Sequence, residues 1–133
     1  MRLRFPAVLL VAIPALLLLA EGSTTHRYLT FEERVAAQRA IERVYYTHQI
    51  GATRSFDEAV PHTVLERKVI TYLRQSVALE RFWNTPVTAE ALRSELRRMR
   101  AGTRMPERLR EIEQVLGHDT FLIEETLARA ALV

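Results

Sequence analysis

The side chains most able to do chemistry in this 133-residue sequence are four histidines and four serines. Metal sites and hydrolytic centres need such groups beside carboxylates, at spacings that bring them to one helix face or one turn. The histidines are scattered, and none has a partner at metal-ligand spacing: His26, His48, His62 and His118. Neither His-Glu-x-x-His nor Gly-x-Ser-x-Gly occurs in the sequence. We therefore expect no metal ion and no catalysis.

Composition argues against two further kinds of site. No glycine-rich loop can cradle a phosphate, because the four glycines are isolated: Gly22, Gly51, Gly102 and Gly117. Cysteine is absent, so the chain has neither disulfides nor thiolate metal sites. We expect no cofactor. The acid pairs Asp57-Glu58 and Glu124-Glu125 are adjacent in sequence and do not face each other on a helix, which favours a solvated role.

Arginine supplies 18 of the 19 basic residues, yet the formal net charge is only +3. The basic residues cluster in one stretch, in which Glu95 and Glu107 are the opposing charges: Arg93, Arg97, Arg98, Arg100, Arg104, Arg108 and Arg110. This run is typical either of a solvated surface or of a face for an anionic partner, which would be a nucleic acid, a lipid headgroup or an acidic polypeptide. Because a nucleic-acid binder should be strongly basic, we expect no nucleic-acid partner.

Residues 1–22 have the pattern of a secretory signal peptide. Two arginines precede an apolar stretch of 16 residues, 5–20, and a small-x-small site follows at Ala20, Glu21 and Gly22. We expect cleavage after Gly22, or after Ala20 as the second choice, and a periplasmic or extracellular protein. The alternative is an uncleaved anchor, although a bilayer span needs about 20 apolar residues. Membrane contact is expected only through that segment, if it is retained.

Beyond a flexible tail at residues 23–29, the apolar residues recur with helical spacing, and no stretch alternates long enough to indicate a strand. We expect an all-α fold: one domain over residues 30–133, built as a small bundle of about five helices with one long central helix. The helices are expected at about 31–48, 64–83, 89–100, 106–116 and 120–132. Residues 49–62 form an intradomain connection, with one short turn at Ser55 to Glu58.

Start and stop signals set these boundaries. Thr30 with Glu33 and Thr63 with Glu66 have capping-box spacing, in which each side chain bonds to the other residue's backbone N–H. The remaining signals are two cap residues, a first-turn proline and a C′ glycine: Thr88, Asp119, Pro106 and Gly117.

Aromatic side chains offer the best candidate binding surface. Tyr72, Phe82 and Trp83 of the long helix, with Met99 as an adaptable wall, are candidates to line a groove for apolar peptide segments, and the Tyr45-Tyr46 pair is a candidate to join them. The competing interpretation places these side chains in the hydrophobic core, and for Trp83 we favour the core.

The segment from Leu65 to about Leu127 resembles the N-terminal helical region of SurA-like periplasmic chaperones and PpiC (parvulin-type) foldases. The similarity rests on the long helix, a turn and a short helix, seen in Leu65-Glu66-Arg67-Lys68-Val69-Ile70, Pro86-Val87-Thr88-Ala89-Glu90-Ala91-Leu92 and Glu95-Leu96-Arg97-Arg98-Met99. The resemblance implies a helical chaperone module that holds unfolded polypeptide. The sequence departs from the family in having no Gly-Gly-x-Leu-Gly stretch, no β-rich isomerase domain and no returning final helix. We therefore expect no prolyl isomerisation.

Two functions remain open at this point. One is an exported, non-catalytic module that binds unfolded polypeptide or a partner protein. The other is a structural or assembly module of a larger envelope or secreted protein, which includes the case of a truncated product whose other domains lie elsewhere. The sequence indicates neither the client nor the oligomeric state.

Overall fold

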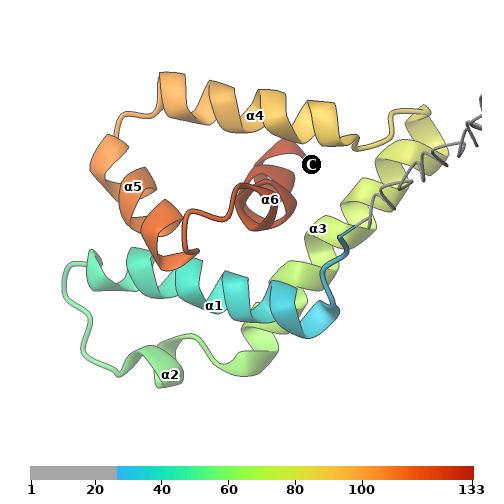
Figure 1. Cartoon of the computed structure of the whole chain (residues 1–133). Coiled ribbons are helices and arrows are strands. Elements are labelled where there is room, and N and C mark those ends of the chain that lie inside the picture. The colour runs from blue at the N-terminus through green and yellow to red at the C-terminus, as the bar shows by residue number, and fades with distance from the viewer. Residues whose placement is uncertain (1–26) are drawn as a thin grey trace, which may run out of the picture.

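A computed structural model describes residues 27–133, and every regular element in this range is helical (Figure 1). The all-α prediction is confirmed. The elements are α1 (Phe31–Thr47), α2 (Phe56–Ala59), α3 (His62–Trp83), α4 (Ala89–Gly102), α5 (Pro106–Val115) and one continuous last helix formed by α6 (Thr120–Ile123), the π-helical segment η1 (Glu124–Ala128) and α7 (Arg129–Leu132). The expected signal peptide, residues 1–22, and most of the tail at 23–29 lie outside the described range. No helix in that range is long and apolar enough to cross a membrane.

The helix starts follow most of the expected signals. The Thr30 hydroxyl accepts from the Glu33 N–H at 3.1 Å, and the Glu33 carboxylate accepts from the Thr30 N–H at 2.7 Å. At the starts of α4 and of the last helix, the side chains of Thr88 and Asp119 accept from the backbone N–H groups of Ala91 and Leu122, with no reciprocal bond. These side chains satisfy N–H groups that a first helical turn leaves without partners, so short polar motifs set the helix ends.

The expected capping box at Thr63 and Glu66 does not form, because α3 begins earlier, at His62. Pro61 occupies the N-cap position, with φ −58°, and its carbonyl accepts from the Val64 N–H at 2.9 Å. Pro61 therefore caps the start of α3, and Thr63 lies within the first turn.

The connection between α1 and α3 contains the expected short turn as a helix of its own. Ser55 and Glu58 form a complete capping box at the start of α2. Phe56 is buried there, with the guanidinium of Arg43 at 4.6 Å from its ring centroid and the Tyr46 ring edge-on to it. This helix raises the count from the five expected to six within residues 27–133.

The last helix, rather than the long helix α3, lies at the centre of the domain. It contacts α1, α3 and α4, and Figure 1 shows it end-on with α1, α4 and α5 around it. The main core cluster draws on α1, α4, α5 and the last helix, with Ile41, Leu96, Ile112, Ile123 and Leu127 among its members. The expectation of a long central helix is corrected in this respect.

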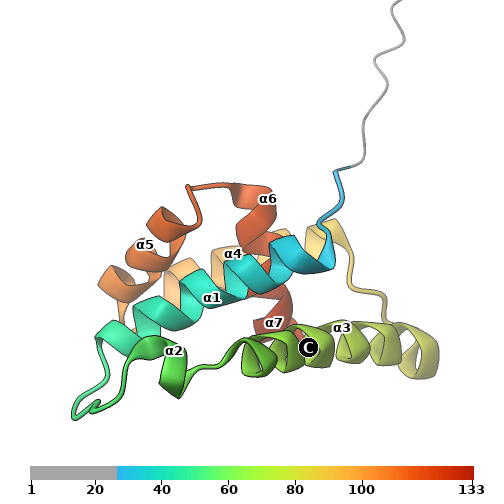
Figure 2. The same ribbon diagram turned by 90° about the horizontal axis from the view of Figure 1, so that it is seen from below.

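Helix α3 is long but peripheral, and it runs along one edge of the molecule (Figure 2). Its buried residues are Leu65, Val69 and Tyr72, which pack with Val35 of α1 in a second cluster. All three lie in its first half. The second half therefore extends beyond the elements that cover the first.

Candidate functional site

Tyr72, the first of the expected binding residues, belongs to the core. Its side chain is 3% exposed and packs with Leu65 and Val69. Its buried hydroxyl has no hydrogen-bond partner among the described residues. Burial raises the pKa of this phenol, and the nearby charges of Arg34 and Arg129 only partly oppose that rise. Tyr72 borders a separate groove with Gln38 and Lys68, and that groove includes neither Phe82 nor Trp83.

Phe82 and Trp83 lie together at the exposed end of α3. Their ring centroids are 6.0 Å apart in an edge-to-face arrangement, and the residues are 71% and 66% exposed. The preference for Trp83 in the core is therefore wrong. Trp83 continues the stripe that holds Leu65, Val69 and Tyr72, but the neighbouring helices bury that stripe only as far as Tyr72.

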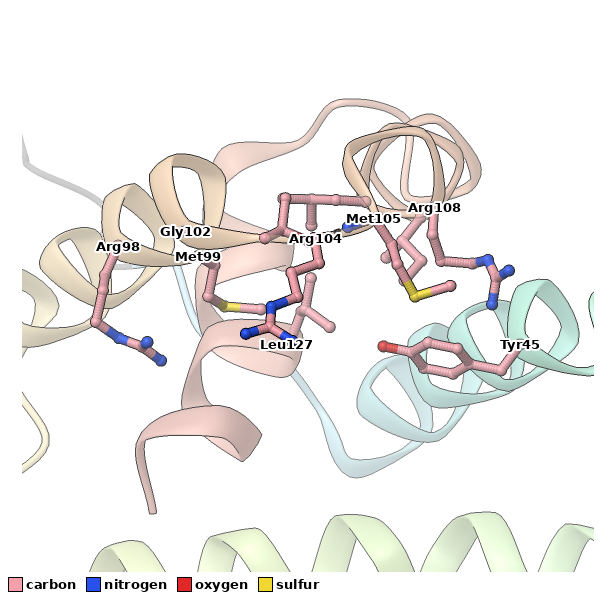
Figure 3. A pocket seen from close by; sticks show the side chains of 11 residues that line it. Tyr45, Arg98, Met99, Gly102, Arg104, Met105, Arg108 and Leu127 are labelled. Atoms are coloured by element: carbon pink, nitrogen blue, oxygen red, sulfur yellow. Dashed lines mark hydrogen bonds between the residues drawn. The ribbon is translucent and has the colours of Figure 1, made fainter.

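Met99 lies in a different place, in a pocket of about 350 Å³ between α1, α4, α5 and the last helix. Figure 3 shows Tyr45 of α1 reaching across this pocket toward the connection between α4 and α5. The structure thus unites Met99 with Tyr45 and separates both from Tyr72, Phe82 and Trp83. The lining consists of Tyr45, Arg98, Met99, Gly102, Thr103, Arg104, Met105, Arg108, Leu109, Ile112 and Leu127.

The α4–α5 connection is held in place by local hydrogen bonds. The Thr103 N–H donates to the Met99 carbonyl at 3.0 Å, and the Thr103 hydroxyl accepts from the Met105 N–H at 3.1 Å. Pro106 then starts α5, as its position in the sequence predicts. This short, ordered connection presents Met105, which is 52% exposed, at the pocket mouth.

The charges of the pocket come from the basic run noted in the sequence. Arg98 is occupied within the domain, because its Nε donates to the buried carboxylate of Glu95 at 2.8 Å. The hydrogen bond from Arg98 holds the pKa of Glu95 below its ordinary value. Arg104 and Arg108, in contrast, form no ion pair with any residue from 27 to 133. These two guanidinium groups are available to an external anion.

Two polar atoms in the pocket are suited to hydrogen bonding with a ligand. The Nε of Arg108 is buried and has no hydrogen-bond partner in the described part of the chain. Burial raises the pKa of the Tyr45 phenol, so its hydroxyl keeps its proton at neutral pH. A buried donor without an acceptor costs free energy. An acceptor on a ligand would relieve that cost once the Arg108 side chain turns its Nε toward the pocket.

Comparison with known protein families, curated proteins and solved structures finds no match to this chain. The resemblance to SurA-like chaperones therefore stays a prediction that rests on helix-start patterns. A function has to be inferred from the geometry of the domain itself.

A larger groove of about 500 Å³ lies between α1 and α5, but its charges are already paired. Both of its arginines, Arg39 and Arg43, form ion pairs with Asp57 of α2. Its walls are made largely of small or short side chains, such as Ala36 and Ala40. The smaller pocket has both the longer apolar side chains and the unpaired charges.

Within residues 27–133, each histidine lies close to at most one carboxylate. His48 lies 2.6 Å from Glu111, and His62 lies 3.5 Å from Glu66. No group of three or more His, Cys, Asp or Glu side chains within residues 27–133 is placed to hold a metal ion. The pocket therefore offers a ligand apolar contacts, positive charge and hydrogen-bond donors.

Met99, Tyr45 and the arginines of the pocket are identifiable from the sequence, whereas Met105 and Leu127 are not among the expected binding residues. Met105 could have been found from the sequence, because it is a large apolar residue next to Arg104 in a short connection, directly before a helix-starting proline. Leu127 could not, because its helical spacing is equally typical of a residue fully enclosed in the core.

Proposed function

We propose that the domain is a non-catalytic binding module that holds an extended polypeptide segment in the pocket around Met99. One apolar side chain of the segment rests on Met99, Met105 and Leu127. An acidic side chain of the neighbouring residue in the segment forms ion pairs with Arg104 and Arg108. The observation that carries this proposal is an apolar pocket bordered by two arginines that have no acid partner among the described residues.

The size of the pocket supports a side chain as the ligand rather than a cofactor. Ligand pockets in proteins range from about 300 to 1,000 Å³, and this one is near the lower end at about 350 Å³. That space suits one or two apolar side chains. Methionine is unbranched and polarizable, so Met99 and Met105 suit clients of varied shape.

The charge at the rim adds selectivity to this apolar contact. Charged groups across an interface favour complementary partners and disfavour like-charged ones. Arg104 and Arg108 therefore favour segments in which an apolar residue lies beside Asp or Glu. Clients with lysine at the same position are expected to bind more weakly.

The proposal is tested by the ability of the chain to suppress aggregation of an unfolded outer-membrane protein, followed by light scattering. Wild type at several-fold molar excess is expected to suppress aggregation, and Met105→Ser to suppress it less. Val115→Ser is the matched control, because Val115 is 50% exposed in the α1–α5 groove and Met105 is 52% exposed.

Three results would count against the proposal. No suppression by wild type contradicts it outright, and equal loss in Met105→Ser and Val115→Ser contradicts the choice of pocket. Co-purification of one stoichiometric partner, with no affinity for unfolded chains, would favour the assembly module instead.

A further inference from the structure

The outward face of α3 carries a stripe that takes no part in the core or in the pocket. Arg67, Ile70, Arg74, Val77 and Arg81 recur at spacings of three and four residues, so they lie along one side of the helix. All five side chains are exposed. We call these five residues the α3 stripe.

The three arginines of the stripe have no acid partner in the described part of the chain. The guanidinium of Arg81 lies 6.0 Å from the centroid of the Phe82 ring. The ring has no net charge, so the positive charge of Arg81 is not neutralised. The acids of α3 border the stripe on one side, since Glu66 lies one turn from Ile70 and Glu80 one turn from Val77, but within residues 27–133 neither forms an ion pair with an arginine of the stripe. The stripe is therefore a line of free positive charge with apolar side chains between its members.

The shape of the stripe matches a flat surface. Residues 67 to 81 span about 21 Å of a straight helix. Figure 2 shows α3 along one edge of the molecule, with α1 on its inner side. The five stripe side chains are exposed, so no neighbouring helix covers this face of α3.

We propose that the α3 stripe binds an anionic lipid surface. Ile70 and Val77 enter the boundary between headgroups and acyl chains, while the three arginines bind the phosphates. Interfacial helices have this combination of basic and apolar side chains. A second copy of the chain fits less well, because a twofold pairing of α3 would place its line of arginines against the same line in the partner.

This site is independent of the polypeptide pocket, since none of the stripe residues lines that pocket. It extends the expected membrane contact, which the sequence limited to an uncleaved N-terminal segment. Each arginine near an anionic membrane contributes about 1 kcal/mol, or about fivefold in affinity. The three together correspond to about 100-fold.

A tryptophan reporter tests the proposal on the full chain. Trp83 is the only tryptophan, and by helical geometry it points to the opposite side of α3 from the stripe. In the variant Val77→Trp with Trp83→Phe, the indole lies in the middle of the stripe instead. Vesicles of phosphatidylglycerol and phosphatidylcholine with brominated acyl chains quench indoles that reach the acyl region.

We expect strong quenching of the indole at position 77 by the anionic vesicles, weak quenching by pure phosphatidylcholine, and weaker quenching of native Trp83. In the reporter background, Arg67→Gln, Arg74→Gln and Arg81→Gln together raise the lipid concentration needed for half-maximal quenching about 100-fold. All variants share residues 1–26, so any binding by that segment is constant among them.

The matched control makes the same change of charge at three arginines elsewhere. Arg54, Arg93 and Arg97 are exposed and unpaired among the described residues, and Arg54→Gln, Arg93→Gln and Arg97→Gln together should leave quenching nearly unchanged. The proposal is overturned if the indole at position 77 is not quenched, or is quenched equally by neutral vesicles. Equal loss in the two triple variants overturns it as well, because net charge alone would then explain binding.

Discussion

Arg34 of α1 and Glu125 of the last helix are joined by two contacts. Arg34 Nη2 lies 2.8 Å from Glu125 Oε2, and Arg34 Nη1 donates to the Glu125 carbonyl at 2.7 Å. Arg129 Nη2 donates to the other carboxylate oxygen at 2.9 Å, and Arg129 Nη1 donates to the Ser76 hydroxyl of α3 at 3.3 Å. Glu125 lies in the π-helical segment of the last helix. Its carboxylate binds Arg34 of α1 directly and is connected to Ser76 of α3 through Arg129, so these contacts link three helices.

Removing that carboxylate is expected to destabilise the domain. The charged side chains are only 13% and 14% exposed, so Glu125→Gln leaves two poorly solvated arginines without their partner. We expect a loss of about 2 kcal/mol or more in the free energy of unfolding, measured in urea. Glu107→Gln removes an exposed pair with Arg110 and should cost less than about 1 kcal/mol. Equal losses in the two variants would contradict the role of Glu125.

The same group predicts a pH dependence. Burial acts to raise the pKa of Glu125, but hydrogen bonds from Arg129 and Arg34 outweigh it and hold the pKa below its ordinary value. A carboxylate with a lowered folded-state pKa stabilises the fold above its unfolded pKa of about 4.3, and this contribution is lost as the pH falls through the folded-state pKa. Wild type should therefore lose more stability than Glu125→Gln between about pH 5 and pH 3. Parallel curves of unfolding free energy against pH would contradict this.

Substitution of alanine at two glycines should change the stability of the domain in opposite directions. Gly117 has φ +67° in the turn after α5, where its N–H donates to Gln114 and the His118 N–H donates to Glu113. Gly102 is helical, and at either site an added Cβ would have no atom within 4 Å. Thermal melts should show Gly117→Ala destabilised by about 1 kcal/mol and Gly102→Ala unchanged or stabilised by about 0.5 kcal/mol. A neutral Gly117→Ala would show that the turn after α5 is not as described.

The exposure of Trp83 at the end of α3 can be tested by fluorescence quenching and by mutation. Since its side chain is 66% exposed, its fluorescence should be quenched by iodide nearly as well as that of a free indole. Trp83→Ser should leave the free energy of unfolding nearly unchanged, because surface substitutions are usually within about 0.5 kcal/mol. Poor quenching together with a large loss of stability would instead place Trp83 in a core.

The local features of the fold could be predicted from the sequence because their causes are local. Thr30, Thr88 and Asp119 cap their helices with side chains only three residues from the N–H groups that they bind. Pro61 shows where this reasoning fails. A proline after α2 suggests a stop signal for that turn, whereas its fixed φ also suits the start of α3.

The burial of α3 and the pocket depend on tertiary packing, which helical spacing does not reveal. The spacing of Tyr72 and Trp83 assigns both to one face of α3, but only Tyr72 has neighbouring helices over it. Likewise, Tyr45 and Leu127 come together only because the last helix lies between α1 and α4. Pairs so distant in sequence have no local signature.

The proposed binding function requires Arg104 and Arg108 to select a polypeptide segment with an acidic residue beside an apolar one. The most direct test is fluorescence anisotropy with two labelled peptides that differ only by Asp or Lys next to a leucine. The Asp peptide should bind about tenfold more tightly, and Arg104→Gln with Arg108→Gln should abolish this preference, while Arg93→Gln with Arg97→Gln should retain it. Equal affinity of wild type for the two peptides, or no binding of either, would contradict this binding function.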